Sequence, residues 1–203
     1  ALACSIGIVL LIGCGNGGLK TTKNEYLGDI PSLEKGYYEK MEAKEKAIKE
    51  CTDMEKAFEL AKEKDLLKEE WENKIKESFT NNPLTKPLPF EGSLGEGYSL
   101  KEIKVDNATR GNMNLKFVVN IEKDMTNEYG GGVKDLMAYF KAVDKDGKDI
   151  EGSTTVAVMM QRQELKAGMT VECTGTWQNK GLRNMENFAK IVIITKEAYD
   201  QVK

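Results

Sequence analysis

The hydrophobic and polar positions divide the chain into five stretches. Residues 1–13 form an almost uninterrupted apolar run, and residues 14–31 are polar and rich in Gly, Thr and Asn. Over 32–79 the apolar positions recur at helical spacing, and a Pro- and Gly-rich stretch follows over 80–97. Over 98–203 the period falls to two, which is typical of strands. The pattern predicts an apolar leader, a tether, a helical segment, a connector and a β-domain.

The helical segment is predicted to form two helices. It contains no Pro and a single Gly, and its apolar stripe changes phase near the middle. Thr52 followed by Glu55 matches a capping box, which marks the start of a second helix. We therefore expect helices over about 32–50 and 53–79, folded back on each other, with Ser32 as the first N-cap. A single rod, roughly 70 Å long, is the alternative.

Alternation in the C-terminal half is clearest along one stretch whose apolar residues are Leu115, Phe117, Val119 and Ile121. Asp146-Gly147 and Ala167-Gly168 supply turns between strands. This spacing favours an antiparallel β-sandwich. Further strands are predicted at about 98–106, 135–144, 154–161, 169–178 and 187–195.

Several predicted strands are apolar on both faces. In the strand around Phe140, Leu136 and Ala138 lie on one face, and Met137 and Tyr139 lie on the other. One face has to meet a second sheet, and another layer has to cover the outer face. The helical pair is the expected cover. The fold class is therefore predicted as α+β, with the N-terminal helical pair packed on a C-terminal antiparallel sandwich.

The N-terminal apolar run ends in Leu11-Ile12-Gly13-Cys14, and polar, glycine-rich sequence follows. Thirteen uncharged residues are fewer than the ~20 that a helix needs to cross a bilayer core, but they suit a secretory signal. The stretch resembles a bacterial lipoprotein signal. The resemblance implies cleavage before Cys14, lipid attachment to Cys14 and a membrane anchor. A buried core helix or strand is the alternative.

Composition excludes several kinds of chemistry. The chain has no His, which excludes Ser-His-Asp and Cys-His catalysis and His-based zinc sites. It has 30 Lys and Arg against 33 Asp and Glu, and the two signs are mixed, so nucleic acid is not an expected partner. Cys51 and Cys173 could form one disulfide or remain two buried thiols, because nothing in their spacing selects that pairing.

Two stretches of the C-terminal half carry a resemblance to a known family. The first contains Phe140, Asp144 and Gly147, and the second is Leu165-Lys166-Ala167-Gly168-Met169-Thr170-Val171. They resemble the immunoglobulin-like accessory domains of bacterial secreted lipoproteins, including the FxLYD type, although Ala142-Val143 replaces the Leu-Tyr of that motif. The resemblance covers about 97–196. It implies an Ig-like sandwich and no particular activity.

The tether and the helical middle are similar to those of lipoproteins from gut-type Bacteroidetes. In that family an acidic run after the lipidated cysteine directs export to the cell exterior, and Gly15-Asn16-Gly17 lacks such a run. The resemblance therefore implies a place in the bacterial cell envelope, on the periplasm-facing side of the outer membrane.

Three aromatic residues are candidate binding residues. Tyr139 and Trp177 could supply a platform for a glycan, and Trp71 could anchor an interface with another protein, although core packing is the default for each. The stretch 144–149 holds three Asp residues, but its spacing does not match an EF-hand, and a polar hairpin turn explains it. Gly130-Gly131-Gly132 is expected to form a loop. No metal or cofactor is predicted.

The leading functional hypothesis is a non-enzymatic, lipid-anchored envelope protein that binds an envelope protein or a glycan. The second is an inhibitor or immunity-type protein that blocks an envelope enzyme; an exposed apolar patch centred on Trp71 or on the loop 130–132 would favour it. The third is a hydrolase that uses only carboxylates, which would need two acids about 5–10 Å apart across a cleft.

Overall fold

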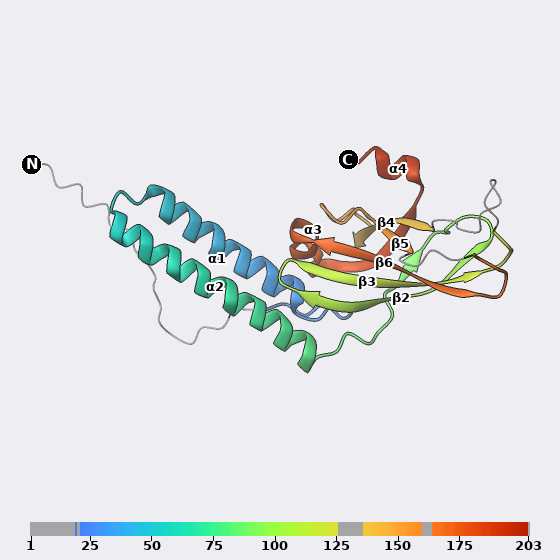
Figure 1. Ribbon diagram of the computed structural model, residues 1–203, viewed down its shortest axis with the longest axis horizontal. Coiled ribbons are helices and arrows are strands. Elements are labelled where there is room, and N and C mark those ends of the chain that lie inside the picture. The colour runs from blue at the N-terminus through green and yellow to red at the C-terminus, as the bar shows by residue number, and fades with distance from the viewer. Residues whose placement is uncertain (1–18, 20, 126–135, 160–163, 203) are drawn as a thin grey trace, which may run out of the picture.

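The computed structural model describes residues 19, 21–125, 136–159 and 164–202. In this part of the chain, a two-helix hairpin projects from one end of a curved β-sheet (Figure 1). The elements, in chain order, are α1 (Ile30–Glu50), α2 (Met54–Asn81), β1 (Phe90–Glu91), β2 (Tyr98–Thr109), β3 (Asn112–Ile121), β4 (Met137–Asp144), β5 (Thr155–Met159), β6 (Thr170–Gln178), α3 (Asn179–Arg183), the 3-10 helix η1 (Met185–Asn187), β7 (Phe188–Ile194) and α4 (Lys196–Asp200).

The helical segment folds as two antiparallel helices, so the predicted pair is confirmed and the single rod is wrong. The chain turns between Glu50 and Met54, and Asp53 caps α2. Its carboxylate accepts hydrogen bonds from the backbone N–H groups of Glu55 and Lys56 at 2.9 and 3.1 Å. The predicted capping box was therefore one residue too early, because an Asp is at least as good an N-cap as the neighbouring Thr.

The first helix begins at Ile30, two residues before the predicted N-cap. Ser32 therefore lies inside the first turn, and its Oγ accepts a hydrogen bond from the backbone N–H of Thr22 at 3.0 Å. Asp29 precedes the helix but does not cap it with its side chain; its carboxylate accepts from the hydroxyl of Ser78 on α2. This contact joins the start of α1 to the end of α2. None of the helices in the described ranges combines the length and the apolar character needed to span a bilayer.

All seven described strands belong to one sheet, in the order β1-β7-β4-β5-β6-β3-β2. β1 is parallel to β7, and the other neighbours are antiparallel. The α+β class is therefore correct, but the predicted two-sheet Ig-like sandwich is not confirmed. The sheet instead curls toward a barrel and encloses its own core.

The inner face of this sheet forms the hydrophobic core. Every second residue of β3 is buried, which confirms the period-two pattern. Phe117 of β3 packs against Phe140 of β4 with ring centroids 4.7 Å apart, and Trp177 of β6 packs against Phe188 of β7 at 5.5 Å. Each of these four rings is almost fully removed from water. Because curvature turns one face inward, the sheet needs no second sheet to bury that face.

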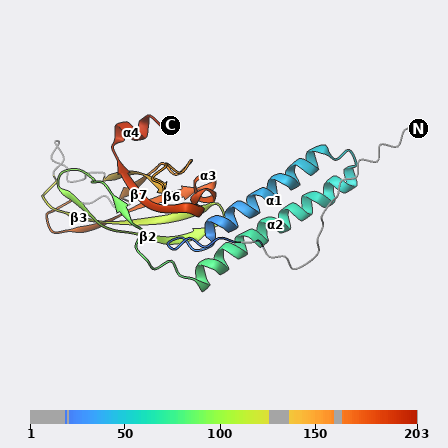
Figure 2. The ribbon, with the colours of Figure 1, turned by 180° about the vertical axis from the view of Figure 1, so that it is seen from behind.

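The helical hairpin was predicted to cover the outer face of the sheet, and this prediction is wrong. Its base contacts mainly β2, α3 and η1, and the rest of it extends away from the sheet (Figure 2). Between Met41 and Trp71 every residue is at least partly exposed. Two ion pairs, Lys44 with Glu63 and Lys64 with Glu45, link the helices along this projecting part.

The segment before α1 is fastened to η1 and to the start of β7. The side-chain amide of Asn24 donates hydrogen bonds to the backbone oxygens of Phe188 and Glu186, at 2.8 and 3.3 Å. The amide oxygen of Asn24 accepts from the N–H groups of Tyr26 and Leu27. Leu27 itself is fully buried. The later part of the predicted tether therefore belongs to the folded body.

Candidate functional site

The most unusual polar group lies where the hairpin meets the sheet. Glu34 of α1 is only 1% exposed, and its Oε1 accepts a hydrogen bond from the backbone N–H of Gly111 at 2.7 Å. Gly111 lies in the turn between β2 and β3 at a φ of +75°, a conformation that glycine adopts without strain. A carboxyl group of the first helix therefore holds the tip of a β-hairpin.

Burial raises the pKa of Glu34 from 4.5 to about 7, because the charged form loses its hydration. The N–H of Gly111, the indole of Trp71 and the positive charge of Arg110 oppose this effect, and the negative charge of Glu72 adds to it. Burial is the largest of these influences. The carboxyl group therefore changes its ionisation near neutral pH while enclosed by protein.

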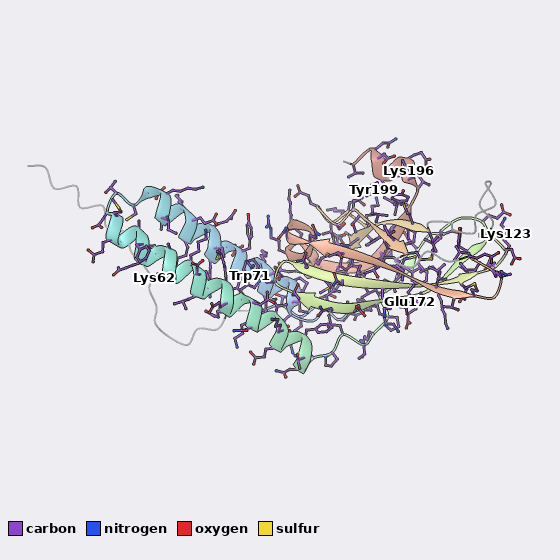
Figure 3. All side chains as sticks on the ribbon, viewed as in Figure 1. Lys62, Trp71, Lys123, Glu172, Lys196 and Tyr199 are labelled. Atoms are coloured by element: carbon purple, nitrogen blue, oxygen red, sulfur yellow. The ribbon has the colours of Figure 1, made fainter. Side chains whose placement is uncertain are left out.

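Trp71 of α2 lies at the same junction, at the hairpin base, far from Lys62 of the same helix (Figure 3). It is 7% exposed, stacks on the ring of Tyr37 at 6.1 Å, and carries the guanidinium of Arg110 over its ring at 5.5 Å. Its indole Nε1 is buried without a regular hydrogen bond, although its N–H still favours the charged form of Glu34. Trp71 is therefore not the centre of an exposed patch.

A shallow groove of about 380 Å³ opens beside this junction. Its lining includes Glu69 and Glu72 of α2 and Arg110 of the β2–β3 turn, and Glu72 pairs with Arg110 across 3.8 Å. The two carboxylates come from one turn of a single helix, so they do not face each other across the groove. This arrangement does not meet the requirement of a carboxylate-only hydrolase.

The outer face of β4, β5 and β7 carries a strip of apolar side chains. The strand register places Val156, Tyr139 and Ile194 side by side, and neighbouring Met137 is 44% exposed. The ring of Tyr139 lies 5.0 Å from that of Tyr199, and Figure 3 places Tyr199 on α4 beside this face.

A groove of about 290 Å³ runs along this face. Apolar side chains dominate its lining, and the ammonium-bearing side chain of Lys196 borders it. Of the three predicted binding residues, only Tyr139 thus lines a surface groove. The lining of this groove includes Leu94, Met137, Tyr139, Ile194 and Lys196.

Trp177 is 1% exposed and belongs to the core. Its indole Nε1 donates a hydrogen bond to the backbone oxygen of Ser153 at 3.2 Å, and its ring packs on those of Phe140 and Phe188. The structure therefore corrects its assignment as a surface platform and supports the default of core packing. A Trp within an alternating strand pattern lies on the buried face when its neighbours at i±2 are apolar.

The Asp-rich turn is held by hydrogen bonds between its own residues. Asp144 accepts hydrogen bonds from the backbone N–H groups of Asp146 and Lys148, both at 2.9 Å, and Gly147 adopts a φ of +76°. Within the described ranges no three Cys, Asp or Glu side chains gather as metal ligands would. Cys51 and Cys173 are free thiols, and burial raises the pKa of the Cys173 thiol to about 12.

Three sequence predictions lie outside the described residues: the signal segment 1–13, the lipid attachment at Cys14 and the loop 130–132. Glu34 was missed as a site residue, although it interrupts the apolar stripe of Ile30, Tyr37 and Met41 at helical spacing. Comparisons with family models, with curated proteins and with solved structures found no match.

Proposed function

We propose that this is a lipid-anchored protein of the bacterial cell envelope that binds a partner without catalysing a reaction. The observation that carries the binding role is the apolar outer face of β4, β5 and β7, where Tyr139 lies between Val156 and Ile194 beside the exposed Met137. Contiguous apolar surface with a polar rim is typical of an interaction site.

Burial of the three groups whose pKa is shifted most argues for binding rather than catalysis. Glu34, Tyr37 and Cys173 each have a raised pKa, and each is 2% exposed or less. A catalytic group has to reach the substrate, whereas these groups are enclosed. The groove beside Tyr139 instead offers mainly apolar contacts with a single cation at its border.

The proposed anchor is Cys14, and its support is the sequence: an apolar run, small residues around the cysteine and a polar tether. The periplasm-facing outer membrane is the proposed location, and an envelope protein or a glycan is the proposed partner. An evolutionary relation of the curved sheet to Ig-like accessory domains is part of the same proposal and rests on the residues around Phe140 and Gly168.

The anchor is tested by mass spectrometry of the N-terminal peptide from the native protein, together with a Cys14→Ser variant. Acylation that disappears in the variant, together with release of the variant from membranes, is the expected result. An unmodified Cys14 in the native protein would refute the anchor.

The binding face is tested with a photo-crosslinking amino acid at position 139 in native envelopes. A matched probe at Lys101, an exposed position on β2, serves as the control. We expect a defined crosslinked product from position 139 only. Identical products from both positions would refute a specific role of this face. The inhibitor hypothesis is the alternative form of the proposal, and it predicts that the crosslinked partner is an enzyme whose activity falls on binding.

A further inference from the structure

The projecting part of α2 carries three large hydrophobic side chains that nothing in the described part of the chain covers. Met54 is 88% exposed, Phe58 is 63% exposed and Leu66 is 65% exposed. Among the described residues, the other exposed large hydrophobic side chains are Met137, beside the outer face of β4, and Val202, beyond α4. Single exposed apolar residues are ordinary, but three on one stretch of a single helix form a group.

These side chains lie along one row of the helix. Residues four positions apart stack into a ridge on a helix surface, and Met54, Phe58 and Leu66 share such a row with Lys62. The ammonium of Lys62 lies 4.5 Å from the centre of the Phe58 ring, so it joins the row through a cation–π contact. We call these four residues the α2 ridge. Figure 3 places Lys62 on the part of α2 that extends away from the sheet.

The projecting part of the hairpin buries little of its own surface. Between Met41 and Trp71 no residue is fully buried, so the two helices enclose no core there. Helices gain most of their stability in proteins from packing an apolar face against a neighbour. A hairpin that leaves such a ridge in water is therefore an incomplete helix bundle, and a third helix along the ridge would complete its packing.

Acidic side chains border the α2 ridge. Glu55 and Glu59 each follow a ridge residue by one position, so they lie in the neighbouring row. Within the described ranges neither carboxylate forms an ion pair. Residues 53–66 contain five acidic and three basic residues, and one of the basic residues, Lys64, is already paired with Glu45. A partner that covers the ridge therefore meets an apolar row with a negatively charged border.

We propose that the α2 ridge docks an amphipathic helix of another protein whose apolar stripe is bordered by Lys or Arg. The ridge is roughly 18 Å long at 1.5 Å per residue, so a helix of about 14 residues covers it. Basic residues beside the stripe would supply the counter-ions that Glu55 and Glu59 lack. The flexible side chain of Met54 suits it to packing against such a partner. This inference goes beyond the proposed function, because it concerns a different surface and holds whether or not the chain carries a lipid.

Charge disfavours two other occupants of the ridge. A second copy would pair the two ridges about a two-fold axis. Antiparallel pairing about position 60 sets Glu55 opposite Asp65 of the other copy, and parallel pairing sets Glu55 opposite its own equivalent. Like charges meet in both arrangements, which costs binding energy. An anionic bilayer would repel the carboxylates of Glu55 and Glu59 in the same way.

The test is an NMR titration of the ¹⁵N-labelled full chain with the capped basic peptide acetyl-LKKALKKLAKKLAK-amide, whose Leu residues share one helix face. We expect the amide signals of Met54, Phe58 and Lys62 to shift. The charge-reversed peptide acetyl-LEEALEELAEELAE-amide should bind at least about tenfold more weakly. Equal binding of the two peptides, shifts confined to elements other than α2, or no shift at millimolar peptide would overturn the proposal.

Three variants sharpen this test. Phe58→Ala removes the ring of the ridge while Ala keeps the helix, and it should weaken binding about tenfold. Val202→Ala removes an apolar side chain of similar exposure outside the ridge and should bind within about twofold of the parent. Joint replacement of Glu55 and Glu59 by Gln should weaken binding about fivefold. Unchanged binding in Phe58→Ala would place the peptide elsewhere and refute the assignment.

Sedimentation of the full chain, alone and with phosphatidylglycerol vesicles, tests the other two occupants. We expect the parent and Phe58→Ala to have the same oligomeric state and to bind the vesicles equally. A dimer that Phe58→Ala dissociates would make a second copy the occupant. Vesicle binding that Phe58→Ala abolishes would make the bilayer the occupant, and either result would overturn the proposal.

Discussion

Replacing Glu34 by Gln should flatten the pH dependence of stability. In the folded protein the pKa of Glu34 is about 7, against 4.5 for an ordinary Glu. As pH rises from about 4.5 to about 7, the unfolded chain releases this proton while the folded chain keeps it. The folded state therefore binds more protons, and the free energy of unfolding falls with rising pH in this interval. Below it and above it, this group contributes no slope.

The magnitude follows from the pKa difference. Each pKa unit corresponds to about 1.36 kcal/mol, so a rise of about 2.5 units gives about 3 kcal/mol lost between pH 4.5 and pH 7 to 8. Gln keeps an oxygen that can accept the hydrogen bond from Gly111 but has no proton to lose. Glu34→Gln should therefore be more stable than the parent at pH 8 relative to pH 4.5 by about this amount.

Urea unfolding at half-unit steps from pH 4 to pH 8 measures the effect. Glu39→Gln is the matched control, because Glu39 lies on the same helix with an exposed side chain. The curve for Glu39→Gln should run parallel to that of the parent, whereas the curve for Glu34→Gln should separate from it as pH rises. Parallel curves for Glu34→Gln, with a spread below about 1 kcal/mol, would contradict an enclosed carboxyl group at the hairpin base.

Three other substitutions or treatments have definite outcomes. Asp53→Ala should destabilise the protein by about 1 kcal/mol in thermal melts, because the α2 cap is lost, and Thr52→Ala should have almost no effect. A larger loss in Thr52→Ala would show that Thr52 is the N-cap after all. Gly175→Ala should cost about 1–3 kcal/mol by the same measurement, because its Cβ would press on an aromatic ring, and a neutral result would mean that the ring moves freely. Iodoacetamide at pH 8, followed by peptide mass mapping, should modify Cys51 and leave Cys173 untouched until urea is added; equal labelling would show that the core opens readily.

Local patterns predicted the elements that depend on neighbours in the chain. Helical periodicity identified both helices, and alternation identified β3, because a single buried face determines both patterns. The predicted sandwich was not confirmed, because a two-sheet and a curled one-sheet arrangement demand the same alternation. β1 was missed altogether: it consists of two residues in a Pro-rich connector, and its pairing with β7 involves Ile191, about a hundred residues away.

The candidate sites also divide into those that local sequence predicts and those that depend on contacts between distant residues. Trp177 could be assigned to a buried face from its strand, whereas the junction of Glu34, Trp71 and Arg110 joins three distant parts of the chain. No local signal brings residue 110 to residue 34. The early end of the β5–β6 pairing could not be predicted either, since it depends on where two strands stop pairing rather than on their composition.

The bonds from Asn24 to the backbone at Phe188 have a consequence for biosynthesis. A chain that emerges N-terminus first presents its earliest anchoring side chain long before the acceptor exists. The two helices can pair early, but the backbone acceptor for Asn24 at the hairpin base is absent until β7 has formed. Truncated chains that stop before β7 should thus lack the fastened hairpin base and be more sensitive to proteases.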